Sequence, residues 1–218
     1  MDKEMMETCT DFLLAHNGPA TATALATVSG GERSHDQVTR FLSGQDYTSK
    51  ELWRRVKPAV RRVESDGGCL IFDDTIQEKE WTDENEVICW HFDHVQNRAV
   101  KGINLLNALY HAQGVTLPVA FELIKKPEVF YDQAAGKLKR RATVTKNEHM
   151  RAMITACAGN QLRFRYVLMD SLFCANENLC FIVEKKRHFI AAMKGNRLVA
   201  LSLEDKRKGR FQAISALE

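Results

Sequence analysis

The sequence has few of the features that mark extracellular, metal-clipped or membrane-spanning chains. Its 218 residues include only four prolines and six cysteines, and no two cysteines form a C-x-x-C pair. It contains no run of about 18 apolar residues that would cross a bilayer, and its N-terminus lacks the basic-then-apolar order of a secretory signal. These absences argue against a disulfide scaffold, a structural zinc site and a membrane protein. We expect a cytoplasmic protein with buried thiols.

The sequence also lacks a strong excess of charge of either sign. Its formal net charge of +3 is too small to establish a nucleic-acid partner by itself. Basic residues nevertheless cluster in residues 50–62 and again just after residue 184. Such clusters can neutralise phosphates, although solvated helix faces produce the same pattern. The candidate phosphate contacts are Arg54, Arg55, Lys185, Lys186 and Arg187.

Residues 1–66 are expected to form a small all-helical domain. Apolar residues recur at three- and four-residue spacing between Met5 and Leu13, which is the period of one helix face. Ser34 and Gln37 form a capping-box pattern at the start of a later helix. Two short helices across a glycine turn are typical of a helix-turn-helix that reads a DNA groove, and also of an ordinary helical bundle. The outward-facing candidates for DNA contact are Gln37, Thr39 and Arg40.

The pattern becomes strand-like after Gly67 and Gly68, which we take as the boundary of a second domain, residues 67–218. Residues 69–72 are uniformly apolar, as expected for a strand buried on both faces. Pro118 interrupts an alternating strand and predicts that this strand lies at a sheet edge. Further strands are expected at residues 87–94, 102–110, 115–123, 163–169, 189–194 and 197–203, the last two joined by a Gly195-Asn196 hairpin turn, and helices at 145–159 and 175–184.

This order of elements predicts an α/β protein. An antiparallel meander with a proline-bearing third strand, followed by a helical crossover to a parallel fourth strand, is the layout of the ribonuclease-H-like fold. We therefore expect a ribonuclease-H-like mixed sheet preceded by the helical domain, which would carry the helix-turn-helix.

Carboxylates follow two of the predicted strands. Asp73 and Asp74 follow the first strand, and Asp170 ends a later one. Strand ends in open α/β sheets converge on one site, and grouped carboxylates favour a hard cation such as Mg²⁺ or Mn²⁺. Paired metals there would promote phosphodiester cleavage. Capping of the following turn is an alternative role for the first two acids, and a haloacid-dehalogenase-like phosphatase would need an aspartate where Thr75 stands.

Several segments resemble one family of DNA-processing enzymes. They are LIFDDT at 70–75, residues 88–126, YVLMDSLFCANEN at 166–178 and FIAAMKGNR at 189–197, with SHDQVTRFLSG at 34–44. Together they resemble DDE-class insertion-sequence transposases of the family typified by insertion sequence four. The resemblance implies a ribonuclease-H-like core that binds Mg²⁺ or Mn²⁺. It also implies double-stranded DNA partners, namely terminal inverted repeats and target DNA, no membrane partner, and a homodimer on DNA as one arrangement.

The same resemblance assigns catalytic and metal-binding roles to Asp74 and Asp170, with Asp73 as the less favoured metal ligand. Transposases of this family carry a third acid, a glutamate within a pattern of Tyr, Arg, Glu and Lys, and this sequence has no such pattern. The chain also ends within an apolar-periodic segment that begins at Phe211. We therefore expect an incomplete core, the front part of a longer transposase with impaired activity. The alternative is a non-catalytic DNA-binding remnant or a repressor of transposition.

Overall fold

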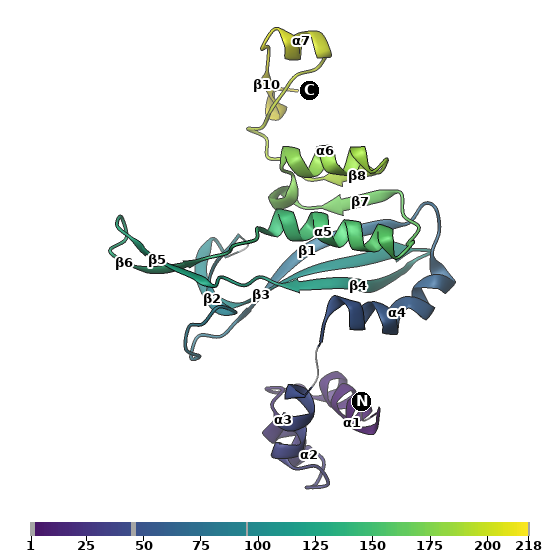
Figure 1. Cartoon of the computed structure of the whole chain (residues 1–218), viewed down its shortest axis with the longest axis vertical. Coiled ribbons are helices and arrows are strands. Elements are labelled where there is room, and N and C mark those ends of the chain that lie inside the picture. The colour runs from purple at the N-terminus through teal and green to yellow at the C-terminus, as the bar shows by residue number, and fades with distance from the viewer. Residues whose placement is uncertain (1–2, 45–46, 95, 218) are drawn as a thin grey trace. The chain divides into compact units, whose positions relative to one another are not determined.

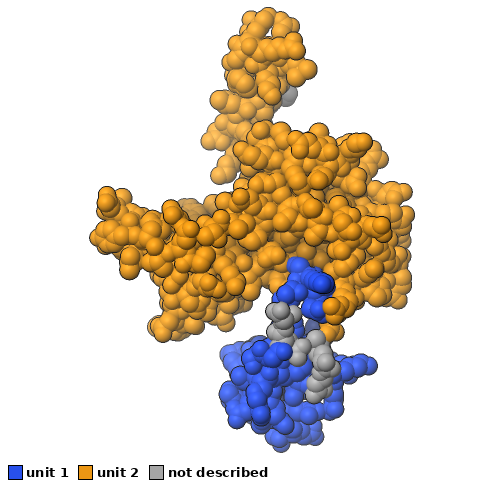
Figure 2. All heavy atoms as spheres, viewed as in Figure 1, with its two compact units in different colours: residues 1–51 blue, residues 52–218 orange. Residues whose placement is uncertain are grey.

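The computed structural model describes residues 3–44, 47–94 and 96–217. The chain forms two compact units, residues 1–51 and 52–218 (Figure 2). The division falls inside helix α4 (Ser49–Val63) and therefore earlier than the predicted boundary at residue 66. The physical reason is that Val60 of this helix is fully buried in the core of the second unit, where Trp53 and Val56 also pack.

The first unit contains the predicted N-terminal helices. They are α1 (Lys3–Ala15), α2 (Ala22–Val28) and α3 (His35–Ser43). The predicted capping box begins α3, because the Ser34 side chain accepts from Gln37 N at 3.2 Å and the Gln37 side chain accepts from Ser34 N at 2.8 Å. A small apolar core holds the helices together. Its buried residues are Met5, Cys9, Phe12, Leu25 and Val38.

A six-stranded mixed sheet forms the centre of the second unit (Figure 1). Strand β1 pairs antiparallel with β3 and parallel with β7, and β7 pairs parallel with β8. The long strand β3 pairs with β2 along its first half and with β4 along its second half. The strands are β1 (Cys69–Glu78), β2 (Ile88–Asp93), β3 (Arg98–Ala112), β4 (Val115–Leu123), β7 (Tyr166–Met169) and β8 (His188–Ala191).

This topology confirms the predicted ribonuclease-H-like mixed α/β fold. Strands β1, β3 and β4 form the antiparallel meander, and α5 (Lys146–Gly159) leads over to the parallel strand β7. Strand β4 carries Pro118 and, among the described strands, pairs with β3 alone, as an edge strand does. The predicted strand of residues 87–94 is β2, which pairs with the first half of β3 while β4 pairs with the second half.

Helices α4, α5 and α6 (Asn176–Glu184) pack on one face of the sheet. Val60, Met150 and Ile182, one residue from each helix, share a single core with Phe72 of β1. Side chains alternate along a strand, and Ile71, next to Phe72, lies on the opposite face outside that core. Among the described residues, no helix is long and apolar enough to span a membrane, and every cysteine is free.

Two hairpins differ from the prediction. An unpredicted hairpin, β5 (Glu128–Asp132) and β6 (Lys137–Arg141), precedes α5. The predicted hairpin of residues 189–194 and 197–203 is wrong, because β8 pairs with β7. Gly195 and Asn196 do not have the positive φ angles that a two-residue hairpin turn requires. The remaining short elements are β9 (Leu198–Val199), which pairs with β10 (Gln212–Ala213), η1 (Ser171–Phe173), α7 (Leu203–Arg207) and η2 (Ile214–Ala216).

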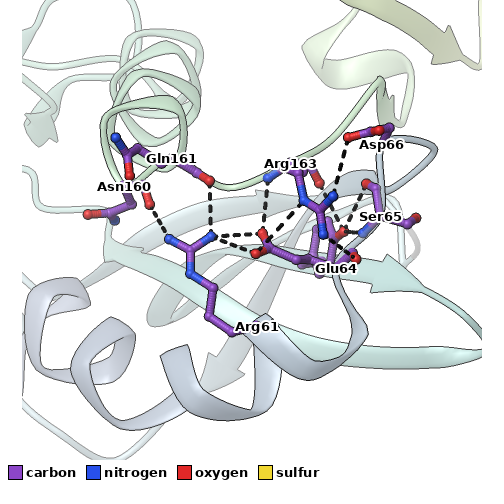
Figure 3. Close-up of polar contacts among 8 residues, drawn as sticks. Arg61, Glu64, Ser65, Asp66, Asn160, Gln161 and Arg163 are labelled. Carbon is purple, nitrogen blue, oxygen red and sulfur yellow. Dashed lines mark hydrogen bonds and ion pairs between the residues drawn. The ribbon is translucent and has the colours of Figure 1, made fainter.

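A polar network joins the end of α4 to the segment between α5 and β7 (Figure 3). Arg61 donates from Nη1 to Gln161 O at 3.0 Å and from Nη2 to Asn160 O at 2.7 Å, which satisfies carbonyls at the end of α5. Glu64, whose side chain is 8% exposed, accepts from Arg61 Nη1 at 2.9 and 2.8 Å and from Arg163 N at 3.3 Å. These contacts hold α4 and α5 together on the same face of the sheet.

Candidate functional site

Asp74 lies in β1 on the face of the sheet that carries the helices. It follows the buried residues Leu70 and Phe72 at the two-residue spacing of a strand. Its side chain is 15% exposed. The Oδ2 atom accepts hydrogen bonds from Lys146 Nζ at 2.5 Å and from Asn104 Nδ2 at 2.7 Å. Asp74 is therefore a partly buried carboxylate that is paired with a cation of its own chain.

Asp170 is the first residue after β7, the parallel neighbour of β1. The last register pair of these strands joins Phe72 to Met169, so Asp73 and Asp170 hold the next positions on the two strands. Adjacent strands lie about 4.8 Å apart, which places the backbones of these acids close together. Both acids are exposed. Asp73 Oδ1 accepts from Asp74 N at 2.9 Å, and Asp170 Oδ1 caps η1.

Asp73 and Asp74 were expected to follow the first strand, but β1 continues to Glu78, so both lie within it and their side chains point to opposite faces of the sheet. Asp170 follows the neighbouring strand β7. The carboxylates of these acids supply oxygen donors of the kind that hard divalent cations prefer. No described cation pairs with Asp73 or Asp170, whereas Asp74 binds the Lys146 ammonium. Among the residues that the structure describes, no three His, Cys, Asp or Glu side chains are grouped so as to hold a metal. The acids fit a divalent cation whose remaining ligands come from water or phosphate oxygens.

The buried titratable groups near Asp74 are neutral rather than cationic. Burial lowers the pKa of His91 to about 4, Lys126 and Lys146 push it in the same direction, and Asp74 opposes them. Burial also raises the pKa of Cys89, whose Sγ lies 3.3 Å from His91 Nε2. A neutral imidazole beside a protonated thiol supplies neither a cation nor a nucleophile at neutral pH. The positive charge closest to Asp74 is therefore Lys146.

The predicted DNA-contacting residues fall on three separate surfaces. Gln37, Thr39 and Arg40 are exposed on α3 of the first unit, although the Gln37 side chain also completes the capping box. Arg54 and Arg55 are exposed on α4, within the second unit.

The basic cluster of residues 185–187 does not lie beside the acids. It precedes β8, and the parallel register of β8 on β7 places it beside the start of β7, whereas Asp170 follows the end of β7. The four residues of β7 separate these two ends by about 13 Å. Lys185 and Arg187 lie over the rings of Phe181 and Phe164. Sequence proximity to Asp170 was therefore misleading for this cluster.

A basic pocket lies between strand β2 and the β5–β6 hairpin. It encloses about 490 Å³, and Trp90, which is 53% exposed, forms part of its wall. Its walls combine an aromatic ring with cations, which suits a phosphate-bearing ligand with a flat base. The cationic lining residues are Lys126, Lys137, Lys139 and Arg140.

Sequence reasoning missed two residues of the site, Lys146 and Asn104. Lys146 lies at the start of the helix predicted at residues 145–159, so this position was readable from the sequence, but its partner was not. Asn104 stands within an apolar strand, where a lone amide is a signal for a buried polar contact. Both contacts depend on how α5 and β3 pack around β1.

A comparison with protein-family models matches residues 2–210 to the family described as DDE superfamily endonuclease. A comparison with curated protein sequences gives no match. Among solved structures, the chain is similar to the piggyBac transposase in a synaptic complex with hairpin DNA, with 9% identity and a TM-score of 0.44 over 90% of this chain and 43% of that one. It is also similar to the Mos1 mariner paired end complex with Mn, with 12% identity and a TM-score of 0.30 over 86% of this chain and 59% of that one. The chain thus spans less than two thirds of each of these proteins. Because the family model covers nearly all of the sequence, the chain belongs to the DDE superfamily endonucleases.

Proposed function

We propose that this protein is a transposase of the type found in insertion sequence four, which cuts and rejoins DNA at the ends of an insertion sequence in the cytoplasm. The observation that carries the proposal is the register of the parallel strands β1 and β7, in which Asp170 holds the position next to Asp73 and Asp74 is the following residue of β1. Membership of a DDE endonuclease family supports phosphodiester chemistry at these acids.

In this proposal Asp74 and Asp170 hold Mg²⁺ or Mn²⁺, and Asp73 is the alternative ligand. A metal bound there would activate a water or a 3′-hydroxyl and stabilise the leaving oxygen. The residues of the chain orient that chemistry. Asn104 fixes the direction of the Asp74 carboxylate from the adjacent strand, and η1 restrains Asp170.

Double-stranded DNA is the proposed partner, bound as terminal inverted repeats and as target DNA. Two exposed regions support it, the polar residues of α3 including Arg40 in its last turn and the basic pocket beside Trp90. Positive charge near a polyanion contributes to affinity through release of counterions. Because the base-reading side chains would lie on α3, we propose that the first unit selects the sequence of the DNA.

The test uses labelled duplex DNA from the inverted repeats that flank the gene. Purified chain is expected to nick this DNA only with Mg²⁺ or Mn²⁺, and Asp74→Asn and Asp170→Asn are expected to abolish nicking while leaving DNA binding intact. Asp66→Asn, a highly exposed acid before the start of β1, is the matched control and keeps activity. Metal-independent nicking, or full activity in Asp74→Asn or Asp170→Asn, would refute the proposal.

A second function, DNA binding without cleavage as a repressor, is favoured by one observation. Among the described residues, no third acid is grouped with Asp74 and Asp170 so as to hold a metal ion. A chain with two of three acids binds metal weakly and loses most catalytic rate. Tight binding to the inverted repeats with no nicking at saturating Mn²⁺ would select this function, and it would also fit the predicted impaired activity.

A further inference from the structure

Lys146 occupies a helix position that disfavours a cation. It is the first residue of α5, and the N-terminus of a helix carries partial positive charge. Acidic side chains are preferred there, and Glu148 of the capping box meets that preference. The positive charge of Lys146 is therefore unfavourable at this helix end unless a negatively charged group outside the helix neutralises it. The compensating group is the Asp74 carboxylate, whose Oδ2 lies 2.5 Å from Lys146 Nζ.

Asn104 holds the same carboxylate from strand β3. It is completely buried, and its Nδ2 donates to Asp74 Oδ2 at 2.7 Å. Its Oδ1 has no hydrogen-bond partner among the described residues. A buried amide oxygen without a partner costs free energy, so packing alone does not account for an asparagine here. Its contact with Asp74 does account for it, because the amide fixes the direction of the carboxylate.

The acids of β1 and the acid that follows β7 therefore differ in whether a cation neutralises them. Asp74 is neutralised by a side chain of which 23% is exposed, while Asp73 and Asp170 are exposed and pair with no described cation. The ammonium lies on one carboxylate oxygen of Asp74, which is also the oxygen that Asn104 restrains. A divalent ion that binds Asp74 through this oxygen has to replace the ammonium.

We propose that Lys146 is an internal counter-cation of Asp74 which a divalent metal ion displaces, while Asn104 keeps the carboxylate in place during the exchange. The proposal rests on the proposed metal-dependent function of Asp74. Two cations on one oxygen repel each other, so metal binding would release the ammonium toward the phosphates of an incoming DNA strand. Lys146 and Asn104 are thus positioning residues, which prepare the acid before the metal arrives.

The first experiment measures Mn²⁺ binding to the full chain by electron paramagnetic resonance of the free ion. Lys146→Gln removes the competing charge, so it is expected to tighten Mn²⁺ binding on the order of tenfold, the equivalent of one charged hydrogen bond. Lys146→Arg keeps the charge and is expected to bind Mn²⁺ like the wild type. In the Asp74→Asn background the Lys146→Gln change is expected to have no effect on Mn²⁺ affinity. The reason is that the carboxylate for which Lys146 and Mn²⁺ compete is no longer present.

Lys139 provides a matched control. Its Nζ lies 2.5 Å from Asp132 Oδ2 on the β5–β6 hairpin, an ion pair of the same length that involves none of the three acids. Lys139→Gln is expected to leave Mn²⁺ affinity unchanged. Circular dichroism verifies that each variant is folded before its affinity is compared.

A second measurement uses only the wild-type chain and therefore does not depend on how any variant folds. Lysine acylation followed by mass spectrometry is carried out with and without Mn²⁺. Release of the ammonium from Asp74 is expected to raise the labelling rate of Lys146 at least severalfold, while the labelling of Lys139 stays constant. Equal labelling of Lys146 in both conditions would overturn the proposal.

The outcomes separate this inference from the proposed function. If Asp74→Asn and Asp170→Asn abolish Mn²⁺ binding but Lys146→Gln leaves the affinity unchanged or weaker, the counter-cation role is refuted and the metal site stands. If neither acid variant alters Mn²⁺ binding, the proposed metal site fails and this inference fails with it. A purely structural role for Lys146 would lower the melting temperature of the Lys146→Gln variant without changing Mn²⁺ affinity.

Discussion

Glu64 is the least exposed carboxylate of the network that fastens α4 to the sheet, and Glu64→Gln is the sharpest test of that network (Figure 3). The substitution keeps the volume of the side chain and removes its charge. In the wild type the carboxylate accepts two hydrogen bonds from Arg61 Nη1 and one from Arg163 N. Glutamine would offer one acceptor oxygen and direct an NH₂ group toward two guanidinium groups.

The expected loss of unfolding free energy follows from the burial of the Glu64 carboxylate, although its partners Arg61 and Arg163 are 30% and 54% exposed. Removing one partner of a buried ion pair costs about 3–5 kcal/mol, and solvent at the arginines and the retained hydrogen bonds of glutamine reduce the loss to about 2–3 kcal/mol. For a unit of this size, a loss of about 2–3 kcal/mol lowers the melting temperature by roughly 4–12 °C. Because α4 carries Trp53 and Val56 into the core, the loss is expected in the global unfolding transition.

The pH dependence gives the same prediction a second, independent check. Burial raises the pKa of Glu64, but Arg61 and Arg163 outweigh burial and hold the pKa below its usual value. A depressed carboxyl pKa contributes stability above its unfolded value, and this stability is lost as pH falls through the folded pKa. The difference between wild type and Glu64→Gln is therefore expected to be largest at pH 7 and to shrink toward pH 3.

Urea denaturation followed by circular dichroism at pH 7 and pH 3 measures both effects. Asp66→Asn is the control, because Asp66 contacts Arg163 in the same network but its side chain is 90% exposed. We expect this exposed pair to contribute on the order of 0.5 kcal/mol or less. A loss below about 1 kcal/mol for Glu64→Gln, or equal losses at both pH values, would contradict this account of how α4 is held.

Three further predictions concern DNA binding and pH. Trp90→Ala is expected to weaken binding of single-stranded DNA by about fivefold to a hundredfold through loss of base stacking, whereas Trp81→Ala, a 95% exposed residue outside the pocket, is expected to have no effect in the same fluorescence anisotropy assay. Arg40→Ala is expected to abolish preference for inverted-repeat DNA in gel-shift competition, while Asp74→Asn preserves it. The lowered pKa of His91 predicts that stability falls as pH decreases from about 6.5 to 4, by up to about 3 kcal/mol, and His91→Gln is expected to flatten this part of the denaturation profile.

Local signals predicted much of the fold. The predicted capping box at Ser34 involves residues three apart, and the structure contains it. The alternation around Pro118 also predicted the edge position of β4 correctly. The uniformly apolar start of β1 predicted a strand buried on both faces, whereas only the face of Leu70 and Phe72 is fully buried. The capping box and the edge strand were readable because each depends on residues that are neighbours in the chain.

Competition between local and distant partners explains what was predicted wrongly. Gly195 and Asn196 have the composition of a hairpin turn, but the strand before them pairs with β7, far back in the chain. The β5–β6 hairpin was missed because strongly charged residues fill its second strand. The cluster of residues 185–187 is near Asp170 in the sequence, but the parallel register of β8 on β7 places it at the opposite end of β7.

The amino-acid sequence by itself determined the helical N-terminal region, the mixed α/β sheet and the presence of acids on two neighbouring strands, although Asp73 and Asp74 lie within β1 and not at its end. Only the tertiary structure decided how those acids differ, since Asp74 is paired with Lys146 and Asn104, respectively 72 and 30 residues away, while Asp73 and Asp170 face solvent. The physical reason is that strand periodicity and capping act over a few residues. The partner of a partly buried carboxylate depends instead on which helix and which strand pack against it.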